Sequence, residues 1–190
     1  MKLFSRIKSH FNRFLKAVLI DTNVTSRNVK LGEHSEVKGS VIKGKINIGV
    51  GCKIHKVSMS GIIDIGNYTS LWGPNIVLEA NINKIVIGNY CSIARNVIIQ
   101  EYSHNMNRFS TYYINKNIIK NGISDVISKG DIKIGSDVWI GSNAVILTGV
   151  SIGTGAVIGA NSIINKDIPP YAIAVGSPAS IIKYRFPPEI

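Results

Sequence analysis

Aliphatic residues recur at every sixth position along the C-terminal half of the chain. The series runs through Ile134, Ile140, Ile146, Ile152, Ile158 and Ile164, and small or β-branched residues follow the first five of these by four positions. A helix repeats near 3.6 residues and a strand at two, so neither gives this period alone. A short strand followed by a two-residue corner does. The pattern therefore predicts a β-solenoid of hexapeptide repeats, with coils of about 18 residues.

The period continues toward the N-terminus with less regular spacing. Ile48 and Ile65 are 17 positions apart, and Ile65 and Ile87 are 22 apart. The first of these coils is therefore predicted to be one residue shorter than a regular coil, and the second is predicted to be four residues longer. Cys52 and Cys91 each follow an aliphatic residue by four positions, which is the small inward slot of the repeat. Both are expected to be free, buried thiols, which suits a reducing cytoplasm.

The repeat is interrupted at length from residue 101 to residue 131. The inserted sequence is polar and aromatic, and such an interruption is an excursion on one face, where binding residues usually lie. The expected β-helix therefore spans 29–168 and carries an inserted loop at 101–131. Pro169 and Pro170 then break the ladder, and 169–190 is predicted to be an extended C-terminal tail.

The start of the chain follows a different pattern. Apolar residues recur at helical spacing, with lysine and arginine mostly on the other flank, which predicts an amphipathic helix over 1–20. This helix is expected to cap the solenoid, dock on a neighbouring subunit or make weak contact with a membrane surface. No transmembrane segment or signal peptide is expected. The net charge of +11 favours anionic partners, but no nucleic-acid motif accompanies it. A cytoplasmic protein is expected.

The segment 130–185 closely resembles the C-terminal half of hexapeptide-repeat acetyltransferases, and a looser likeness begins at residue 31. These enzymes include the maltose and galactoside, the xenobiotic and the surface-polysaccharide acetyltransferases. The resemblance implies an all-β fold, a left-handed parallel β-helix, assembled as a homotrimer. It also implies acetyl-CoA as co-substrate, direct acetyl transfer to a hydroxyl or amine, and no metal.

The resemblance assigns His104, in the inserted loop, the role of general base in a cleft between two subunits. A histidine near neutral pKa is suited to take the proton that the acceptor loses as it attacks the thioester. Glu101, Asp131 or a backbone carbonyl is expected to hold its other ring nitrogen. Backbone N–H groups between Trp139 and Ser142 are expected to stabilise the oxyanion. Trp139 itself lies either beside the active site or in the core.

The same resemblance places CoA along the solenoid. The implied contacts are Gly141, Ser142, Gly159, Ala160, Asn165, Lys166 and Lys183. Lys166 and Lys183, with help from Arg185, are expected to meet the phosphates. Ser180 stands where several sugar acetyltransferases carry arginine, so one phosphate contact is absent or replaced. The repeat itself also demands small residues at the glycine and alanine positions.

The acceptor is the least determined part of this interpretation. A sugar is favoured, either nucleotide-linked or a surface-polysaccharide precursor, because the chain lacks the tryptophan-rich tail of the xenobiotic branch. The alternative is a xenobiotic acetyltransferase acting on chloramphenicol- or streptogramin-type antibiotics. A zinc carbonic anhydrase would need three converging histidines, and the four here include no close pair. An ice-binding solenoid would show a flat face of threonines without a long insertion.

Overall fold

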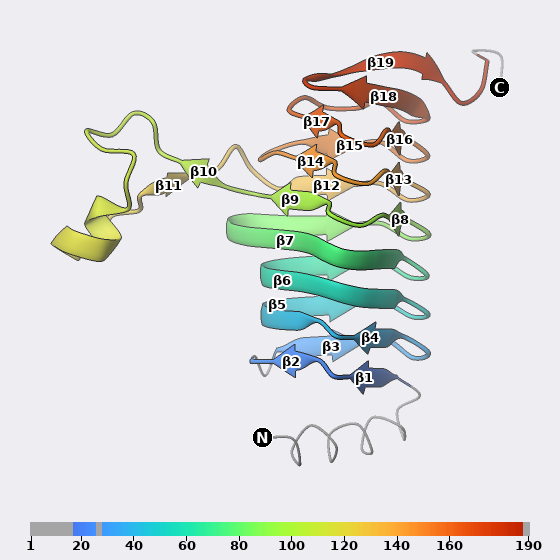
Figure 1. Ribbon diagram of the computed structural model, residues 1–190, viewed down its shortest axis with the longest axis horizontal. Helices are drawn as coiled ribbons and strands as arrows, with labels where there is room; N and C mark the ends of the chain where they lie inside the picture. The colour runs from blue at the N-terminus through green and yellow to red at the C-terminus, as the bar shows by residue number, and fades with distance from the viewer. Residues whose placement is uncertain (1–16, 26–27, 188–190) are drawn as a thin grey trace.

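The chain folds as a single stack of β-coils with one long arm (Figure 1). In this computed structural model the described residues are 17–25 and 28–187. The predicted N-terminal helix over 1–20 therefore lies mostly outside the described residues. Its last positions are strand: β1 (Val18–Ile20) pairs in parallel with β4 (Glu36–Lys38) and begins the solenoid before the expected start at residue 29.

Parallel pairing between successive coils forms three faces, which confirms the predicted β-helix. The first face contains β1, β4, the start of β6 (Lys53–Ile65), the start of β7 (Ser70–Ile87), β8 (Ser92–Ile93), β13 (Trp139–Ile140), β16 (Val157–Ile158) and β18 (Ala172–Gly176). The second contains β2 (Asn23–Val24), the start of β5 (Val41–Ile48), the middles of β6 and β7, β9 (Ile98–Gln100), β14 (Val145–Ile146) and β17 (Ile163–Ile164). The third contains β3 (Val29–Leu31), the ends of β5, β6 and β7, β12 (Ile132–Ile134) and β15 (Ser151–Ile152).

The register confirms the irregular coil lengths. Ile54 lies opposite Leu71, 17 residues later, and Leu71 lies opposite Ile93, 22 residues later. The additional residues of the long coil enter at two register shifts in β7. One of them separates the pair Ser60–Glu79 from the pair Ile62–Lys84. The turn that follows Glu79 therefore bulges at the corner between the second and third faces.

The core is the column of aliphatic side chains that the six-residue period predicts. Ile140, Ile146 and Ile158 are fully buried, and Cys52 and Cys91 occupy inward slots with free thiols. Burial raises the pKa of both thiols above the usual value. Side chains that alternate inward and outward along each short strand account for this single, narrow core.

The end of the chain covers the last coil. β18 continues the first face by pairing in parallel with β16, and β19 (Ala179–Tyr184) folds back on β18 as its antiparallel partner. The predicted extended tail thus forms a hairpin that closes the stack. No helix among the described residues is long and apolar enough to cross a membrane.

Candidate active site

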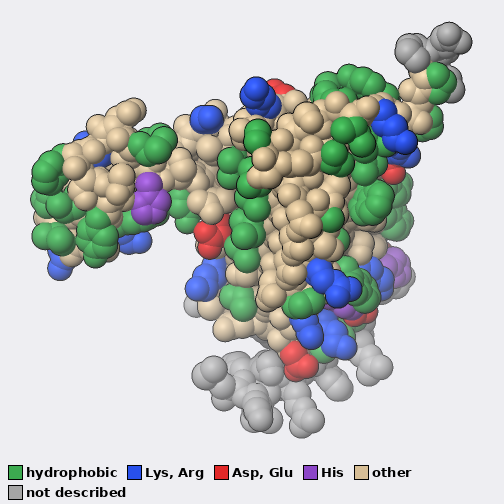
Figure 2. Space-filling view, turned by 45° about the horizontal axis from the view of Figure 1, so that its top comes forward, with side chains coloured by type: hydrophobic (Ala, Val, Ile, Leu, Met, Phe, Trp, Pro, Cys, Tyr) green, Lys and Arg blue, Asp and Glu red, His purple; other side chains and the backbone are tan. Residues whose placement is uncertain are grey.

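The insertion at 101–131 is an arm that projects from the corner between the second and third faces (Figure 1). Its stem is the antiparallel pair β10 (Ser103–His104) and β11 (Val126–Ile127). Its outer part contains a short π-helix, η1 (Asn115–Ile119). Figure 2 shows apolar side chains gathered over this outer part. The exposed ones are Met106, Phe109, Tyr112, Ile118, Ile119 and Ile123.

A carboxylate organises the outer part of the arm. Asp125 Oδ1 accepts hydrogen bonds from the backbone N–H and the side-chain amide of Asn115, at 3.1 and 2.7 Å, and Oδ2 accepts from the Lys116 N–H at 2.8 Å. Burial alone would raise the pKa of Asp125, but the hydrogen bonds from Lys116 and Asn115 outweigh it and hold the pKa below its usual value. The arm therefore has an ordered polar centre of its own.

A second carboxylate fixes the root of the arm. Glu101 is fully buried, and its Oε2 accepts the N–H groups of Asn81 and Ile82 at 2.9 Å each. Its Oε1 accepts the Asn83 side-chain amide at 3.1 Å. Burial acts to raise the pKa of Glu101, but hydrogen bonds from the Ser128 side chain and from the backbone of 81–83 bring it below the usual value. The bulged turn in β7 thus supplies the donors that this carboxylate needs.

The next residue adds a further tie between arm and solenoid. The Tyr102 hydroxyl donates to Glu79 Oε2 at 3.0 Å. Burial and this hydrogen bond to a carboxylate raise the pKa of Tyr102 to about 12. The phenol therefore stays protonated, and the first residues of the arm are held on both sides.

His104 lies on the stem and its side chain is exposed. Its Nδ1 lies 2.6 Å from the carbonyl oxygen of Thr111, and its ring meets Tyr113 edge-on with centroids 4.8 Å apart. Of the three kinds of partner expected for this ring, the structure shows the backbone carbonyl. Glu101 binds the bulged turn, and Asp131 Oδ1 accepts the Lys84 N–H at 3.2 Å, so neither carboxylate orients His104.

This contact selects a tautomer. A carbonyl oxygen only accepts, so Nδ1 of His104 must be the donor to Thr111. In the neutral ring Nε2 then carries the lone pair and can accept a proton. The exposed ring of His104 is therefore able to accept a proton at Nε2.

The four small residues predicted to contact CoA lie together at one corner, between the first and second faces. Gly141 N–H donates to the Ile158 carbonyl at 2.8 Å. A Cβ on Gly141 would lie 2.6 Å from the Ala160 nitrogen, so the two coils touch here without side chains between them. We call Gly141, Ser142, Gly159 and Ala160 the glycine corner. Gly141 itself is buried against the next coil, so the accessible part of this corner is Ser142, Gly159 and Ala160.

The three remaining predicted CoA residues lie elsewhere. Asn165 and Lys166 follow β17 at the next corner, between the second and third faces, and Lys183 lies opposite Ile173 in the terminal hairpin. Both lysines are exposed and make no ion pair with a carboxylate among residues 17–25 and 28–187. The structure does not bring them into contact with the glycine corner.

Arg185 has a different role from the one expected. Its Nη1 donates to Asp137 Oδ2 and to the Gly155 carbonyl, each at 2.8 Å, and its guanidinium lies over the Phe186 ring. These contacts tie the tail to the coil, so this guanidinium is engaged within the chain.

The expected oxyanion donors are mostly engaged as well. The N–H of Trp139 donates to the Ala156 carbonyl at 3.1 Å, and that of Gly141 donates to Ile158. These bonds hold successive coils together, so neither amide is available to a ligand. Within the predicted stretch, Ser142 at the corner remains the candidate donor.

Trp139 lies outside the core, with 57% of its side chain exposed. It lines a hollow of about 210 Å³ on the first face, which we call the tryptophan hollow. The other lining residues are Ser70, Trp72, Ser92, Ile93 and Ala94. Sequence reasoning missed Trp72, although its place one residue after the inward Leu71 marks it as outward-facing.

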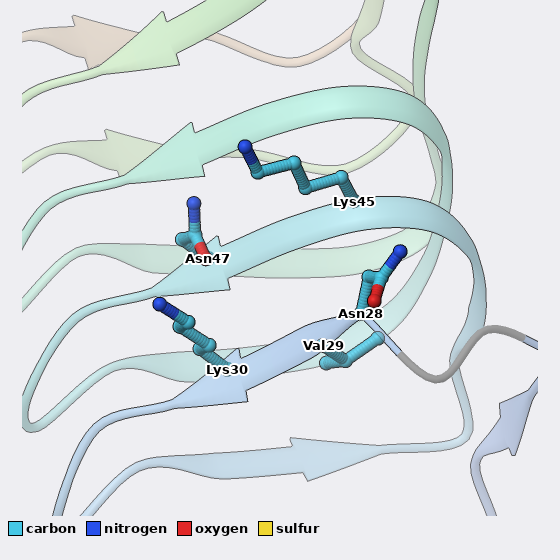
Figure 3. Close-up of a pocket in the computed structure, with 5 residues that line it drawn as sticks. All are labelled: Asn28, Val29, Lys30, Lys45 and Asn47. Carbon is cyan, nitrogen blue, oxygen red and sulfur yellow. The ribbon is translucent and has the colours of Figure 1, made fainter.

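A second hollow lies on the lowest coils, far along the stack from the glycine corner (Figure 3). It has a volume of about 400 Å³ and is lined by Asn28, Val29, Lys30, Lys45 and Asn47. Asn47 is held by its hydrogen bond to Asp64 at 2.5 Å. None of the residues predicted for catalysis or CoA binding lines this hollow.

Catalytic and CoA-binding candidates are separated within one chain. The arm carries His104 outward from the corner between the second and third faces (Figure 1). The glycine corner follows β13 and β16 and lies between the first and second faces. The residue predicted for catalysis and the glycine corner predicted for CoA therefore do not meet within one copy.

Fold and site together define a hexapeptide-repeat acyltransferase. The family profile "Bacterial transferase hexapeptide (six repeats)" matches residues 131–166. A chloramphenicol acetyltransferase of Morganella morganii is 32% identical over 190 residues, covering 96% of this chain and 80% of that protein. The chain belongs to the hexapeptide-repeat acetyltransferase family.

Two further likenesses extend this picture. A probable macrolide acetyltransferase of Lysinibacillus sphaericus is 42% identical over 114 residues, which are 56% of this chain and 63% of that relative. The crystal structure of the polySia-specific acetyltransferase NeuO superposes with a TM-score of 0.62 at 26% identity, covering 90% of this chain and 77% of that one.

Proposed function

We propose that this protein transfers the acetyl group of acetyl-CoA to a hydroxyl group of a chloramphenicol- or macrolide-type compound. The observation that carries the proposal is His104, whose Nδ1 is held by the Thr111 carbonyl and whose Nε2 is left as a base on an exposed arm. The curated relatives that match most of this chain, or its repeat region, are named for chloramphenicol and macrolide. This supports the antibiotic alternative over the sugar acceptor favoured from the sequence.

The reaction is a direct acyl transfer. The acceptor oxygen attacks the thioester carbonyl carbon while His104 Nε2 takes the hydroxyl proton. The tetrahedral intermediate then collapses, the carbon–sulfur bond breaks, and the proton passes to the leaving sulfur to give free CoA. The Ser142 N–H is proposed as a donor to the oxyanion.

Acetyl-CoA is proposed to lie along the glycine corner, where the residues have small side chains or none and the pantetheine arm could approach the backbone. Lys166 and Lys183 are proposed to reach the phosphates with Asn165 beside them, since both ammonium groups are exposed and free of described carboxylate partners. Because Arg185 is bound to Asp137, these two lysines carry the phosphate-binding role.

The working enzyme is proposed to be a homotrimer in which the arm of one copy meets the glycine corner of the next. Two observations support this: the halves of the site are apart in one chain, and the outer arm exposes apolar side chains such as Phe109, which is 97% exposed. The second face offers an outward column of aliphatic residues that could receive a neighbour. In register order the column is Val41, Ser58, Val77, Ile98, Val145 and Ile163, and Ser58 is its one polar residue.

Mixing two inactive variants tests this arrangement. His104→Ala removes the base, and a Lys166→Glu, Lys183→Glu double variant removes the phosphate site. If the site spans two copies, refolded mixtures regain activity above either parent because some interfaces carry both intact halves. A mixture no more active than its parents, with trimers formed, contradicts a shared site.

A sugar hydroxyl or amine is the second candidate acceptor. The likeness to the polySia-specific acetyltransferase and the net charge of +11 favour an anionic glycan. A thiol-release assay with acetyl-CoA distinguishes the two, offering chloramphenicol, a macrolide, a streptogramin, oligosialic acid and a nucleotide-linked amino sugar. Release with the antibiotics supports the main proposal, release with the sugars alone replaces it, and no release with any acceptor rejects both. The cytoplasmic location and the N-terminal helix stay predictions.

A further inference from the structure

Both tryptophans of the chain line the same hollow. The sequence contains two tryptophans, and Trp72 and Trp139 are 54% and 57% exposed on the first face. Leaving two indole rings half in water forgoes a large burial energy, so their joint exposure on one face calls for a ligand-based explanation. The remaining wall of the hollow is small: Ser70, Ser92 and Ala94 contribute little bulk.

The register sets the spacing between the two rings. Ser70 pairs with Ser92, and Ser92 pairs with Trp139, so Trp139 lies two coils above the coil of Trp72. Coils stack at roughly 4.8 Å, so the two positions are about 9.6 Å apart along the solenoid axis. They are also offset by about 6.6 Å along the strands, because Trp139 is in the column of Ser92 whereas Trp72 comes two residues after Ser70. Stacked aromatic rings prefer centroid distances of about 4.5–7 Å. A planar ring over the small side chains of Ser92 and Ala94 could therefore stack on the upper face of Trp72, with Trp139 diagonally across the hollow on its other side.

Trp72 is held in place from below. The imidazole of His55 stacks on its indole with centroids 4.2 Å apart and an angle of 21° between the planes. His55 Nε2 in turn lies 3.1 Å from Glu36 Oε1. One face of the indole is thus covered within the chain and the other is presented to the hollow. A ring fixed in advance loses less entropy when a ligand stacks on it.

The tryptophan hollow and the glycine corner are neighbours in the register. Leu71 pairs with Ile93, and Ile93 pairs with Ile140. Trp72 and Ala94, which line the hollow, are therefore in register with Gly141, the first residue of the glycine corner. A molecule in the tryptophan hollow would lie beside the place where we put the thioester.

We propose that the tryptophan hollow binds a planar aromatic ring of the acceptor, between Trp72 and Trp139. The hollow then selects acceptors that carry an aromatic ring, and Ser70 and Ser92 offer hydroxyls to polar groups on that ring. The catalytic consequence rests on the proposed function, because only acetyl transfer makes the neighbouring corner a thioester site. The ring-binding step itself does not require turnover.

Binding without acetyl-CoA tests the ring-binding step. Chloramphenicol, which carries a nitrophenyl ring, is titrated into the full chain by calorimetry and by tryptophan fluorescence, which reports on this hollow alone. The wild type is expected to bind with quenching. Trp72→Ala is expected to weaken binding at least ~10-fold, whereas Trp72→Phe, which keeps a ring, stays within ~3-fold. Tyr90→Ala is the matched control, since Tyr90 is 61% exposed and stacks with Tyr68 outside the hollow.

The outcomes separate this inference from the proposed function. Binding that Trp72→Ala weakens, in a variant with an unchanged melting temperature, supports the hollow even if no acetylation follows. Equal affinity in the wild type and Trp72→Ala overturns it, as does the absence of binding to the wild type. Tighter binding of oligosialic acid than of chloramphenicol also overturns it. If Trp72→Ala unfolds, the affinities of Trp139→Phe and Trp139→Ala for chloramphenicol are compared in its place, because Trp139 forms the other wall of the hollow.

Discussion

Nδ1 of His104 lies 2.6 Å from the carbonyl oxygen of Thr111, seven residues further along the same arm. The arm therefore orients its own histidine without help from the solenoid. This differs from an arrangement in which a carboxylate holds the ring, because a neutral carbonyl fixes the tautomer and adds no negative charge. The ring orientation is thus set by contacts inside the arm, to Thr111 and Tyr113, and Nε2 is left as the acceptor nitrogen.

Replacing His104 by alanine should remove the base and little else. The side chain is exposed, so we expect an unchanged melting temperature and a kcat for acetyl transfer that falls by at least ~10²-fold. Thiol release from acetyl-CoA measures the rate. His34→Asn is the matched control, because His34 is exposed on an early coil and has φ of 61°, which asparagine tolerates. A full rate in His104→Ala would remove this residue from the mechanism.

Glu101→Gln should lower stability in a pH-dependent way. The carboxylate accepts two backbone N–H groups through Oε2 and the Asn83 amide through Oε1, so a glutamine would turn its NH2 group, which only donates, toward one of these donors. We expect a loss on the order of 2 kcal/mol in the free energy of unfolding at pH 7. Because the pKa of Glu101 is lowered on folding, its contribution is present above the unfolded-state pKa and is lost as the pH falls through the folded one.

Denaturant titrations of the two proteins between pH 7 and pH 3 measure this difference. The gap between wild type and Glu101→Gln should be full at pH 7 and should narrow only below the ordinary value of 4.5. Asp64→Asn, on the third face, controls for loss of an acidic residue with a hydrogen-bonded side chain outside the arm. A gap that is constant with pH would show that the charge of Glu101 does not stabilise the fold.

Much of the fold follows from the six-residue period, because every inward position of a coil must be apolar and every corner takes two residues. The period therefore predicted the 17- and 22-residue coils, the buried Cys52 and Cys91, and the site of the insertion. It did not predict strand at Val18–Ile20, since a short apolar segment at the end of a stack can pair as an edge strand whatever its helical spacing.

The site was less predictable than the fold for a physical reason. Family likeness pointed to His104 and to the residues of the glycine corner, but the partner of the histidine is a backbone carbonyl, which no side-chain pattern records. The stack of His55 on Trp72 joins residues 17 positions apart across a register. The predicted 17-residue coil places the two positions in register, but the period does not encode the side-chain rotamers that bring the two rings face to face.

Lys166→Ala and Lys183→Ala should weaken acetyl-CoA binding. Each removes one exposed ammonium group from the proposed phosphate site, so we expect KM for acetyl-CoA to rise about 3- to 10-fold per lysine, with kcat nearly unchanged. The effect should shrink as salt is raised. Lys30→Ala and Lys45→Ala, in the hollow on the lowest coils, remove the same charge elsewhere and should leave KM unaltered. Equal effects in both pairs would indicate a general charge effect instead of a site.

Gly141→Ala tests how closely the coils approach at the glycine corner. The added Cβ would lie 2.6 Å from the Ala160 nitrogen and 3.0 Å from its Cα, both of them backbone atoms that cannot turn aside. We expect the variant to lose about 2 kcal/mol or more of unfolding free energy and to bind CoA more weakly. The comparison is Gly122→Ala in the arm, where φ is +77° but nothing lies within 4 Å, so the expected cost is only about 1 kcal/mol.

Thermal unfolding and CoA titration of the two glycine variants separate packing from backbone strain. If Gly141→Ala is as stable as the wild type, the coils can move apart at this corner. The close contact with Ala160 would then not explain why a glycine is needed at this position. If it is destabilised but binds CoA with unchanged affinity, the glycine serves the solenoid alone. The combined loss, absent from Gly122→Ala, is the result expected if the added methyl group displaces the backbone of Gly159 and Ala160, because that displacement disturbs both the packing of the coils and the surface proposed to meet CoA.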